Sequence, residues 1–270
     1  MRPTPLVEAV DEAQFGGKAA SLARLLRAGL PVPPGFALAT THVEAVCGGH
    51  AEALTHLRAA FARLAAPCAV RSSAIGEDSD GASFAGQHAT VLNVRDPKHL
   101  LHAVVTVRES AHTESARAYR RTLGMDPIPR VAVVVQCMIE PECAGVMFTR
   151  NPVNGSDERV IEASWGLGEA VVAGLVVPDN YVVDPHGRVL KRSAGTKDVA
   201  LRGSPDGGTV EEVVCADRAT AFCLTEDTLA SLSQLAARCE SVFGRGLDIE
   251  WAFAGGTLHL LQCRAITRGR

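Results

Sequence analysis

Hydrophobic and polar residues alternate most clearly near the end of the chain. Residues 247–253 (LDIEWAF) alternate as a strand does, the turn residues AGGT follow, and residues 258–264 (LHLLQCR) return. Side chains of a strand point alternately to its two faces, so Asp248 and Glu250 share a face, as do Gln262 and Arg264. The pattern predicts an antiparallel hairpin that carries an acid, an amide and an arginine.

Other segments repeat their hydrophobic residues at helical spacing. One of them begins at Phe15-Gly16-Gly17-Lys18 and ends at Gly29, ahead of Pro31, Pro33 and Pro34. Glycine is a common helix stop, and Thr225 is a suitable cap for a later helix that ends at Gly244. The expected helices cover residues 15–29, 41–64 with a break at Gly48-Gly49, 99–123 and 226–243.

The β-branched run at residues 131–139 predicts a buried strand that leads into a second strand at residues 141–149. Strand-like segments flank Pro185-His186-Gly187, which is a hairpin signal. Further strands are expected at residues 35–40, 90–94 and 158–162, and residues 204–209 (SPDGGT) are expected to form a polar loop.

Composition narrows the classes of function. With 270 residues, 47% of them hydrophobic, the chain can build one large domain or two lobes around a cleft. The net charge of -3, the 4% aromatic content and the absence of a basic tract speak against a nucleic-acid partner. No apolar run reaches the ~18 residues of a membrane span, and the first residues lack the apolar core of a signal peptide. No membrane association and a cytoplasmic location are therefore expected.

Cysteine and histidine give no sign of a metal site. None of the eight cysteines forms a C-x-x-C pair, so they are interpreted as buried thiols of a cytosolic chain. His42, His50 and His56 show no ligand spacing and are expected to be solvated.

Two segments are candidates for binding phosphate. Arg71 stands where a strand should end, ahead of the small-residue loop at residues 81–86 (GASFAG), and Lys18 follows two glycines at a helix start. An arginine fork matches phosphate oxygens, and glycines let backbone N–H groups approach an anion. The spacing is not that of a Walker A loop. The alternatives are an ordinary surface turn, and a capping glycine beside a solvated lysine.

Two further segments could bind a base and a metal-bound polyphosphate: the strand end at Gln136–Ile139 and the late hairpin. A chain leaving a buried strand could offer backbone and amide groups to an adenine edge; the alternative is sheet core with a polar end. A carboxylate, an amide oxygen and a guanidinium on adjacent strands suit Mg²⁺ with a polyphosphate. The alternative is a cross-strand Glu–Arg ion pair on a solvated face.

Taken together, these segments resemble the nucleotide-binding domain of the pyruvate phosphate dikinase, phosphoenolpyruvate synthase and rifampicin phosphotransferase family. The resemblance covers nearly the whole chain in order, and its motifs are GGK, VRSSA…EDSDGASFAGQ, VVVQCMIEPECAGVMFTRNP, EASWGLGEAVVAG, GTKDVALRG and DIEWAF…LHLLQCRAIT. It implies an α+β ATP-grasp fold, a single nucleotide-binding domain over residues 1–270, in which two lobes with mainly antiparallel sheets clamp ATP.

The resemblance also implies roles for single residues. Lys18 and Arg71 would bind phosphates, and Gly86 and Thr90 would belong to the loop that closes over them. Gln136, with the backbone at Met138 and Ile139, would read adenine.

In the late hairpin, Glu250 and Gln262 would hold Mg²⁺. Arg264 would neutralise the transferring phosphoryl group, so the expected catalytic residues are Lys18, Arg71 and Arg264.

Relatives in this family carry a swivelling domain with a phosphorylatable histidine and a further acceptor domain, and neither is recognised in this sequence. We therefore expect the ATP-binding component of a dikinase-type system, which cleaves ATP to AMP and passes the β-phosphoryl group to a histidine on a separate domain or protein, then to a small molecule. The alternatives are a free-standing kinase that phosphorylates a small molecule directly, a nucleotide-binding module without turnover, and an ATP-grasp ligase.

Overall fold

A computed structural model describes residues 2–75, 89–122 and 129–266. The chain forms two compact units. The first contains Met1–Arg27, Pro33–Met138 and Ser204–Gly208, and the second contains Ala28–Val32, Ile139–Gly203 and Thr209–Arg270. Each unit combines helices with an antiparallel sheet, which confirms the expected α+β class.

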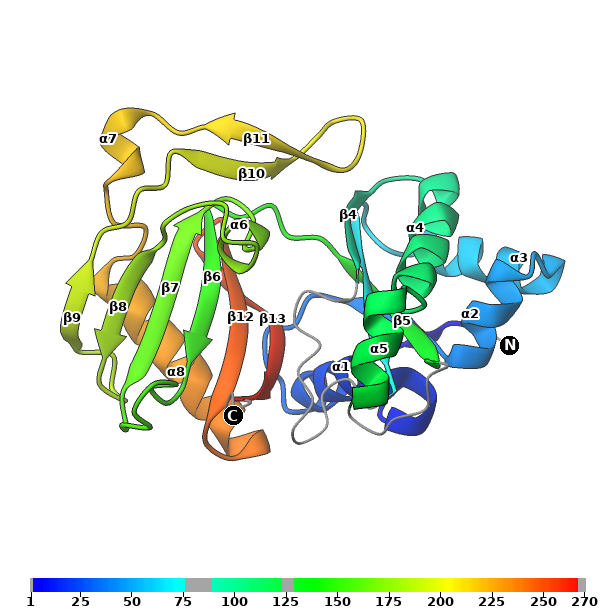
Figure 1. The fold of residues 1–270 in the computed structure, drawn as a ribbon, viewed down its shortest axis with the longest axis horizontal. Helices are drawn as coiled ribbons and strands as arrows, with labels where there is room; N and C mark the ends of the chain where they lie inside the picture. Colours follow the sequence, from blue (N-terminus) through cyan, green and yellow to red (C-terminus); the bar gives the residue numbers. More distant parts are fainter. Residues whose placement is uncertain (1, 76–88, 123–128, 267–270) are drawn as a thin grey trace. The chain divides into compact units, whose positions relative to one another are not determined.

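The first unit is built on one sheet. Among its described residues, five strands pair antiparallel in the order β1-β2-β5-β3-β4 (Figure 1). Their bounds are Thr4–Pro5 for β1, Gly35–Leu38 for β2, Cys68–Ala74 for β3, Thr90–Val94 for β4 and Val131–Cys137 for β5. The β-branched run predicted as a buried strand is β5, which lies between β2 and β3 and is buried along almost all of its length.

Helices cover both faces of this sheet. Side chains of α2, α3 and α4 form one hydrophobic core with Phe36, Val70 and Val133 of the strands. On the opposite face α1 contacts β3, where the Ala19 N–H donates to Ser73 Oγ at 3.0 Å. The first-unit helices are the short η1 (Leu6–Glu8), α1 (Glu12–Arg27), α2 (Thr40–Cys47), α3 (Ala51–Phe61), α4 (Pro97–Ser110) and α5 (Glu114–Thr122).

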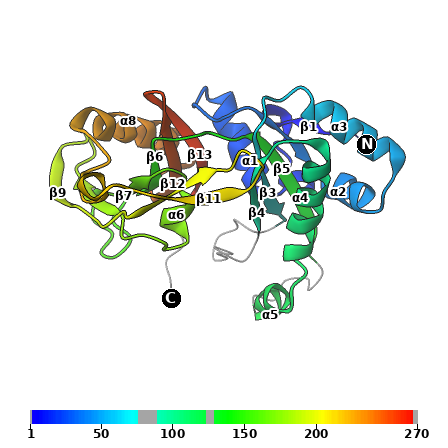
Figure 2. The same cartoon turned by 90° about the horizontal axis from the view of Figure 1, so that it is seen from above.

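The second unit is built on a larger antiparallel sheet. Its described strands follow the order β13-β12-β6-β7-β8-β9, and β10 and β11 form a separate two-stranded ribbon (Figures 1 and 2). The bounds are Cys143–Phe148 (β6), Arg159–Trp165 (β7), Asp179–Val183 (β8), Val189–Ser193 (β9), Val199–Gly203 (β10), Thr209–Val213 (β11), Leu247–Ala254 (β12) and Thr257–Ala265 (β13). Its helices are α6 (Glu169–Val172), α7 (Ala216–Ala219) and α8 (Glu226–Phe243).

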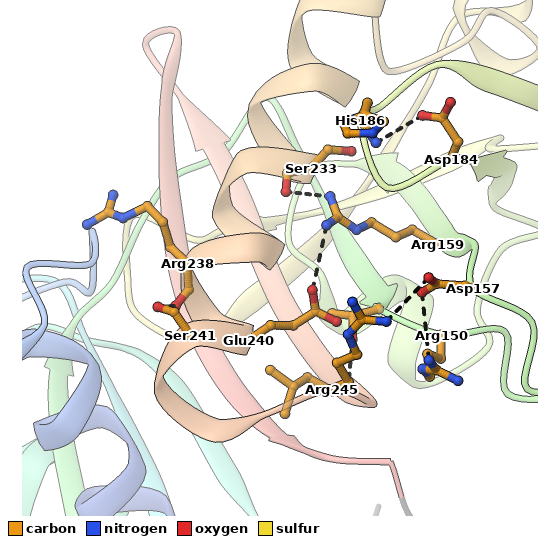
Figure 3. A network of polar contacts seen from close by, with 12 residues as sticks. Arg150, Asp157, Arg159, Asp184, His186, Ser233, Arg238, Glu240, Ser241 and Arg245 are labelled. Atoms are coloured by element: carbon orange, nitrogen blue, oxygen red, sulfur yellow. Dashed lines mark hydrogen bonds and ion pairs between the residues drawn. The ribbon is translucent and has the colours of Figure 1, made fainter.

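Helix α8 is fixed against this sheet by an apolar stripe and by a buried arginine. Leu229, Leu232 and Ala236 are buried at helical spacing. Arg159 of β7 reaches α8, where it donates to the Ser233 carbonyl and lies 3.7 Å from the Glu240 carboxylate (Figure 3). Burial lowers the pKa of Arg159, and the nearby carboxylate of Glu240 opposes that shift. Glu240 therefore stabilises the charged form of a guanidinium that is shielded from water.

A second buried charge pair fixes the segment before β10. Lys197 Nζ lies 2.5 Å from Asp179 Oδ1, and both side chains are fully buried. The same carboxylate accepts from the N–H groups of Gly195 at 2.9 Å and Cys223 at 2.7 Å and from the Tyr181 hydroxyl at 3.3 Å. Asp179 therefore joins β8 to two separate loops of the second unit.

Several expectations need correction. The helix predicted over residues 99–123 is interrupted after Ser110, and α5 begins only at Glu114. The strands β10 and β11 were not predicted, and the polar loop at residues 204–209 connects them.

Two side-chain expectations were also wrong in part. His42 is buried rather than solvated, and burial lowers the pKa of its imidazole. Cys215 is exposed, whereas Cys68, Cys143, Cys239 and Cys263 are buried thiols as expected. Within the ranges that the structure describes, no helix is both long and apolar enough to cross a membrane.

Candidate functional site

Lys18 lies at the start of the regular part of α1 and is not solvated. Gly16 has a φ of 76°, outside the helical region, and a Cβ there would lie 1.9 Å from the Ser73 carbonyl oxygen. Only glycine allows this approach of α1 to β3. The helix then places Lys18 in a buried position, 8% exposed, where its Nζ donates to the Ser72 carbonyl at 3.0 Å. The alternative of a solvated lysine is therefore wrong.

Arg71 belongs to the same region of the first unit. It lies on β3 next to Ser72 and pairs in register with Thr90 of β4. Because side chains alternate along a strand, Arg71 shares with Ser73 the face against which α1 packs. Arg71 is the central residue of β3 (Cys68–Ala74), so the expectation that it stands where a strand ends was wrong. Lys18, through the Ser72 carbonyl, and Thr90, through the strand register, both lie next to this central part of β3. Gly86 lies outside the described residues.

The end of β5 carries the residues expected to read adenine. Gln136 is buried, and its Nε2 donates to the Pro33 carbonyl at 2.9 Å. The Met138 N–H donates to the Pro67 carbonyl at 2.9 Å, and its thioether accepts from the Asn93 N–H at 3.1 Å. One N–H of the Gln136 amide and the Met138 N–H therefore have structural partners. The second N–H of that amide, its oxygen and the backbone at Ile139 are the groups that could face a base.

In the second unit a β-bulge sets the register of the hairpin β12–β13. The turn pairs Ala254 with Thr257, but the register shifts between Glu250 and Trp251. After the shift, Glu250 lies opposite Gln262 and Asp248 lies opposite Arg264. Without the extra residue Glu250 would oppose Leu261, and Gln262 would point to the other face of the sheet. The bulge therefore collects all four polar side chains on one face.

Asp248 is the partner of Arg264. Asp248 Oδ2 accepts from Arg264 Nε at 2.9 Å and lies 2.8 Å from Nη2. The aspartate side chain is 12% exposed. Burial raises the pKa of Asp248, and the adjacent guanidinium opposes that rise. Arg264 thus has Asp248 as an ion-pair partner, and the pair is largely buried rather than on a solvated face.

Glu250 and Gln262 together present a carboxylate and an amide oxygen from directly opposed positions. Hard oxygen donors of this kind fit Mg²⁺, which binds few protein ligands and keeps waters and substrate phosphates as the others. In the described part of the chain no group of three histidine, cysteine or acidic side chains is placed to hold a metal by itself. The donor set of the hairpin therefore fits a magnesium ion that is bound together with a phosphate ligand.

Sequence patterns missed three supporting residues. Asp248 was seen to share a face with Glu250, but its pairing with Arg264 depends on the bulge. Ser73 and Asn93 are small polar residues in strands, and nothing in their spacing signals a contact with α1 or with Met138.

Comparison with known proteins identifies the family. Residues 50–270 match the family model described as the pyruvate phosphate dikinase AMP/ATP-binding domain. The chain is 36% identical to a rifampicin phosphotransferase of a Streptomyces species over 97% of its length, which is 35% of that protein.

Two further relatives come from other organisms. An uncharacterised phosphotransferase of Bacillus subtilis is 33% identical over 96% of the chain, which covers 34% of that protein. A probable phosphoenolpyruvate synthase of Methanothermobacter thermautotrophicus is 34% identical over 93% of the chain and 44% of its own length. The chain thus spans between about a third and under half of the length of these relatives.

Proposed function

This chain belongs to the pyruvate phosphate dikinase AMP/ATP-binding domain family, and from that membership we propose that it is the ATP-binding component of a Mg-ATP-dependent, dikinase-type phosphotransferase. The ATP-grasp fold expected of the family agrees with the antiparallel sheets in both units. The observation that carries the proposal is the bulged hairpin, which places Glu250 opposite Gln262 and Asp248 opposite Arg264.

We propose that residues of each unit contribute to nucleotide binding. Lys18 and Arg71 supply fixed positive charge for the triphosphate. Gly86 and Thr90 are proposed as further phosphate contacts, and Thr90 is the first residue of β4 rather than part of a loop. The buried ammonium of Lys18 is already oriented by the Ser72 carbonyl. A preoriented charge in a partly dehydrated site stabilises a phosphate more than a solvated one does, because little reorganisation is needed when the ligand arrives.

The hairpin supplies the reacting end. Glu250 and Gln262 would hold Mg²⁺, which would supply positive charge to neutralise the phosphate oxygens. Arg264 donates to the phosphoryl group in transfer, and its guanidinium is held in place by Asp248. Phosphoryl transfer demands positioning and electrostatic stabilisation more than covalent help from the protein. At the other end Gln136, Met138 and Ile139 border the adenine.

In the reaction we propose, ATP yields AMP and inorganic phosphate. The β-phosphoryl group passes to a histidine on a separate domain or protein and then to a small-molecule acceptor, while water takes the γ-phosphoryl group. The relatives named above are phosphotransferases and a phosphoenolpyruvate synthase, so rifampicin and pyruvate are the first acceptors to try.

Product analysis tests this proposal. The chain is incubated with Mg-ATP, a histidine-bearing domain from a relative and either acceptor, and nucleotides are separated by chromatography. We expect AMP and inorganic phosphate, formed only when the histidine is present; the same domain with histidine replaced by alanine is the matched control. Formation of ADP alone would instead indicate a kinase with direct transfer, and bound but unchanged ATP would indicate a binding module.

A further inference from the structure

Asn93, near the end of β4, has an unusual backbone conformation for its place in the fold. It is fully buried, and its φ of 58° is the one positive φ found at a non-glycine position in the described chain. Asparagine adopts the left-handed region more readily than other non-glycine residues, but it does so at some energetic cost. The surrounding contacts must therefore hold Asn93 in this conformation.

The side chain of Asn93 binds the loop Ser204–Gly208. Its Nδ2 donates to the carbonyl oxygens of Ser204 and Gly208, each at 2.6 Å. Two carbonyl acceptors require an NH₂ group at this position, which fixes the orientation of the amide. The Asn93 Oδ1 accepts from Arg95 Nη1 at 3.3 Å, and the same Nη1 donates to the Ser204 carbonyl at 3.1 Å.

The loop that Asn93 holds is closed by hydrogen bonds of its own. The Ser204 N–H donates to the Gly208 carbonyl at 3.0 Å, and the Gly207 N–H donates to the Ser204 carbonyl at 3.1 Å. Gly207 has a φ of 98°, and a Cβ there would lie 3.0 Å from His99 Cε1. This compact turn gives the amide of Asn93 two fixed acceptors, which together stabilise its left-handed backbone.

The backbone of Asn93 meets the nucleotide segment. In the left-handed conformation its N–H points at Met138 and donates to Sδ at 3.1 Å. Met138 is thereby held at its side chain by Asn93 and at its backbone N–H by Pro67. Met138 is also the last residue of the first unit before the chain enters the second unit at Ile139.

We propose that Asn93 is a positioning residue for the base end of the nucleotide site. It touches no part of ATP. The hydrogen bonds from its side chain to the Ser204–Gly208 loop hold Asn93 in the left-handed conformation, in which its N–H donates to the Met138 thioether. This contact fixes the backbone at Met138 and Ile139 that borders adenine. This inference rests on the proposed function, in which that backbone reads the base.

The test separates base recognition from phosphate recognition. Calorimetry compares the affinity of the full chain for Mg-ATP and for Mg-tripolyphosphate, which has the phosphates and no base. In Asn93→Asp a carboxylate oxygen replaces the NH₂ group and faces two carbonyl oxygens. Both hydrogen bonds to the loop are then lost, and the oxygens repel one another. We expect the affinity for ATP to fall by about tenfold, the size expected for one lost hydrogen bond of this kind, while the affinity for tripolyphosphate stays within about twofold.

Two further variants complete the experiment. Asn93→Gly retains access to the left-handed conformation without the side chain and should lower the ATP affinity by a smaller factor; it also gives the answer if Asn93→Asp fails to fold. Arg95→Ala removes contacts to Asn93 Oδ1 and to the Ser204 carbonyl but leaves the two Nδ2 bonds and the Met138 contact of Asn93 in place, and it should leave the ratio of the two affinities unchanged.

The outcomes distinguish the two proposals. A wild-type chain that binds neither ligand would refute the proposed function. A wild-type chain that prefers ATP, with both Asn93 variants folded and retaining the wild-type ratio of affinities, would refute the positioning role alone. A merely structural role of Asn93 would lower both affinities together, and that result also counts against the proposal.

Discussion

Replacing Arg264 by alanine is expected to lower the rate of phosphoryl transfer by about a thousandfold, the loss that follows removal of a single charged donor to a phosphoryl group. The reason is geometric. Asp248 fixes the guanidinium through Nε and Nη2, so the arginine is preorganised for charge that develops during transfer. A single-turnover assay, with the chain in excess over Mg-ATP and the histidine-bearing domain present, measures AMP formation and reports this loss directly.

The control variants separate catalysis from folding. Arg264→Ala leaves the largely buried Asp248 without its cation, so the double substitution Asp248→Asn with Arg264→Ala removes the residual charge and should be equally inactive. Arg264→Lys keeps the charge but loses the fork and should recover only part of the rate. Arg245→Ala changes an exposed arginine of the same unit and should be fully active. Full activity in Arg264→Ala would exclude this residue from the site.

The largest expected effect on stability comes from Lys197. Lys197→Met retains most of the side-chain volume but leaves Asp179 buried without a counter-charge. Breaking a buried pair in this way costs about 3–5 kcal/mol. For a unit of this size the melting temperature of its transition should fall by roughly 10 °C, since each kcal/mol corresponds to a few degrees.

A surface pair provides the matched comparison. Arg188 and Asp184 also form an ion pair in the second unit, but the arginine side chain is 79% exposed. Because solvent and salt screen such a pair, Arg188→Ala should lower the free energy of unfolding by ~1 kcal/mol or less. Differential scanning calorimetry of both variants is the measurement. A melting temperature for Lys197→Met no lower than that of Arg188→Ala would show that the buried pair contributes little.

Local patterns were sufficient to predict much of the fold. The alternation in residues 247–264 gives the hairpin β12–β13, and the β-branched run gives β5. Thr225 and Gly244 bound α8 as expected, with Thr225 and Thr228 in a reciprocal capping box. These signals are local, because a cap or an alternating strand depends on a few neighbouring residues.

Long-range contacts were not predictable in the same way. The sequence of the ribbon β10–β11 shows no strong alternation of hydrophobic and polar residues. Its second strand is exposed throughout, so neither of its faces needs hydrophobic side chains. The break at residue 110 is similar, because the charged pattern continues across it. Gly16 was read as a possible cap, whereas its conformation is dictated by the carbonyl of Ser73, which is distant in sequence.

The site shows the same division. Residue type and resemblance pointed to Lys18, Arg71, Glu250, Gln262 and Arg264, and the structure groups these residues within their own units. Which residues lie opposite each other in the hairpin could not be derived from the sequence. The pairing depends on a bulge of one residue, where the register shifts between Glu250 and Trp251. A one-residue shift exchanges the two faces of a strand, so the identity of the acid opposite Arg264 was open until the bulge was known.

The most direct test of the proposal that residues of each unit contribute to binding a magnesium nucleotide is a calorimetric titration with ATP. Wild-type chain should bind one nucleotide per chain, and Lys18→Met in the first unit and Glu250→Ala in the second should each lower the affinity by roughly tenfold to a hundredfold, as expected for a lost charged hydrogen bond. Chelation of Mg²⁺ should abolish the difference between wild type and Glu250→Ala but not the effect of Lys18→Met. A chain without affinity for Mg-ATP, or an affinity that responds to substitutions in only one of the two units, would contradict the account.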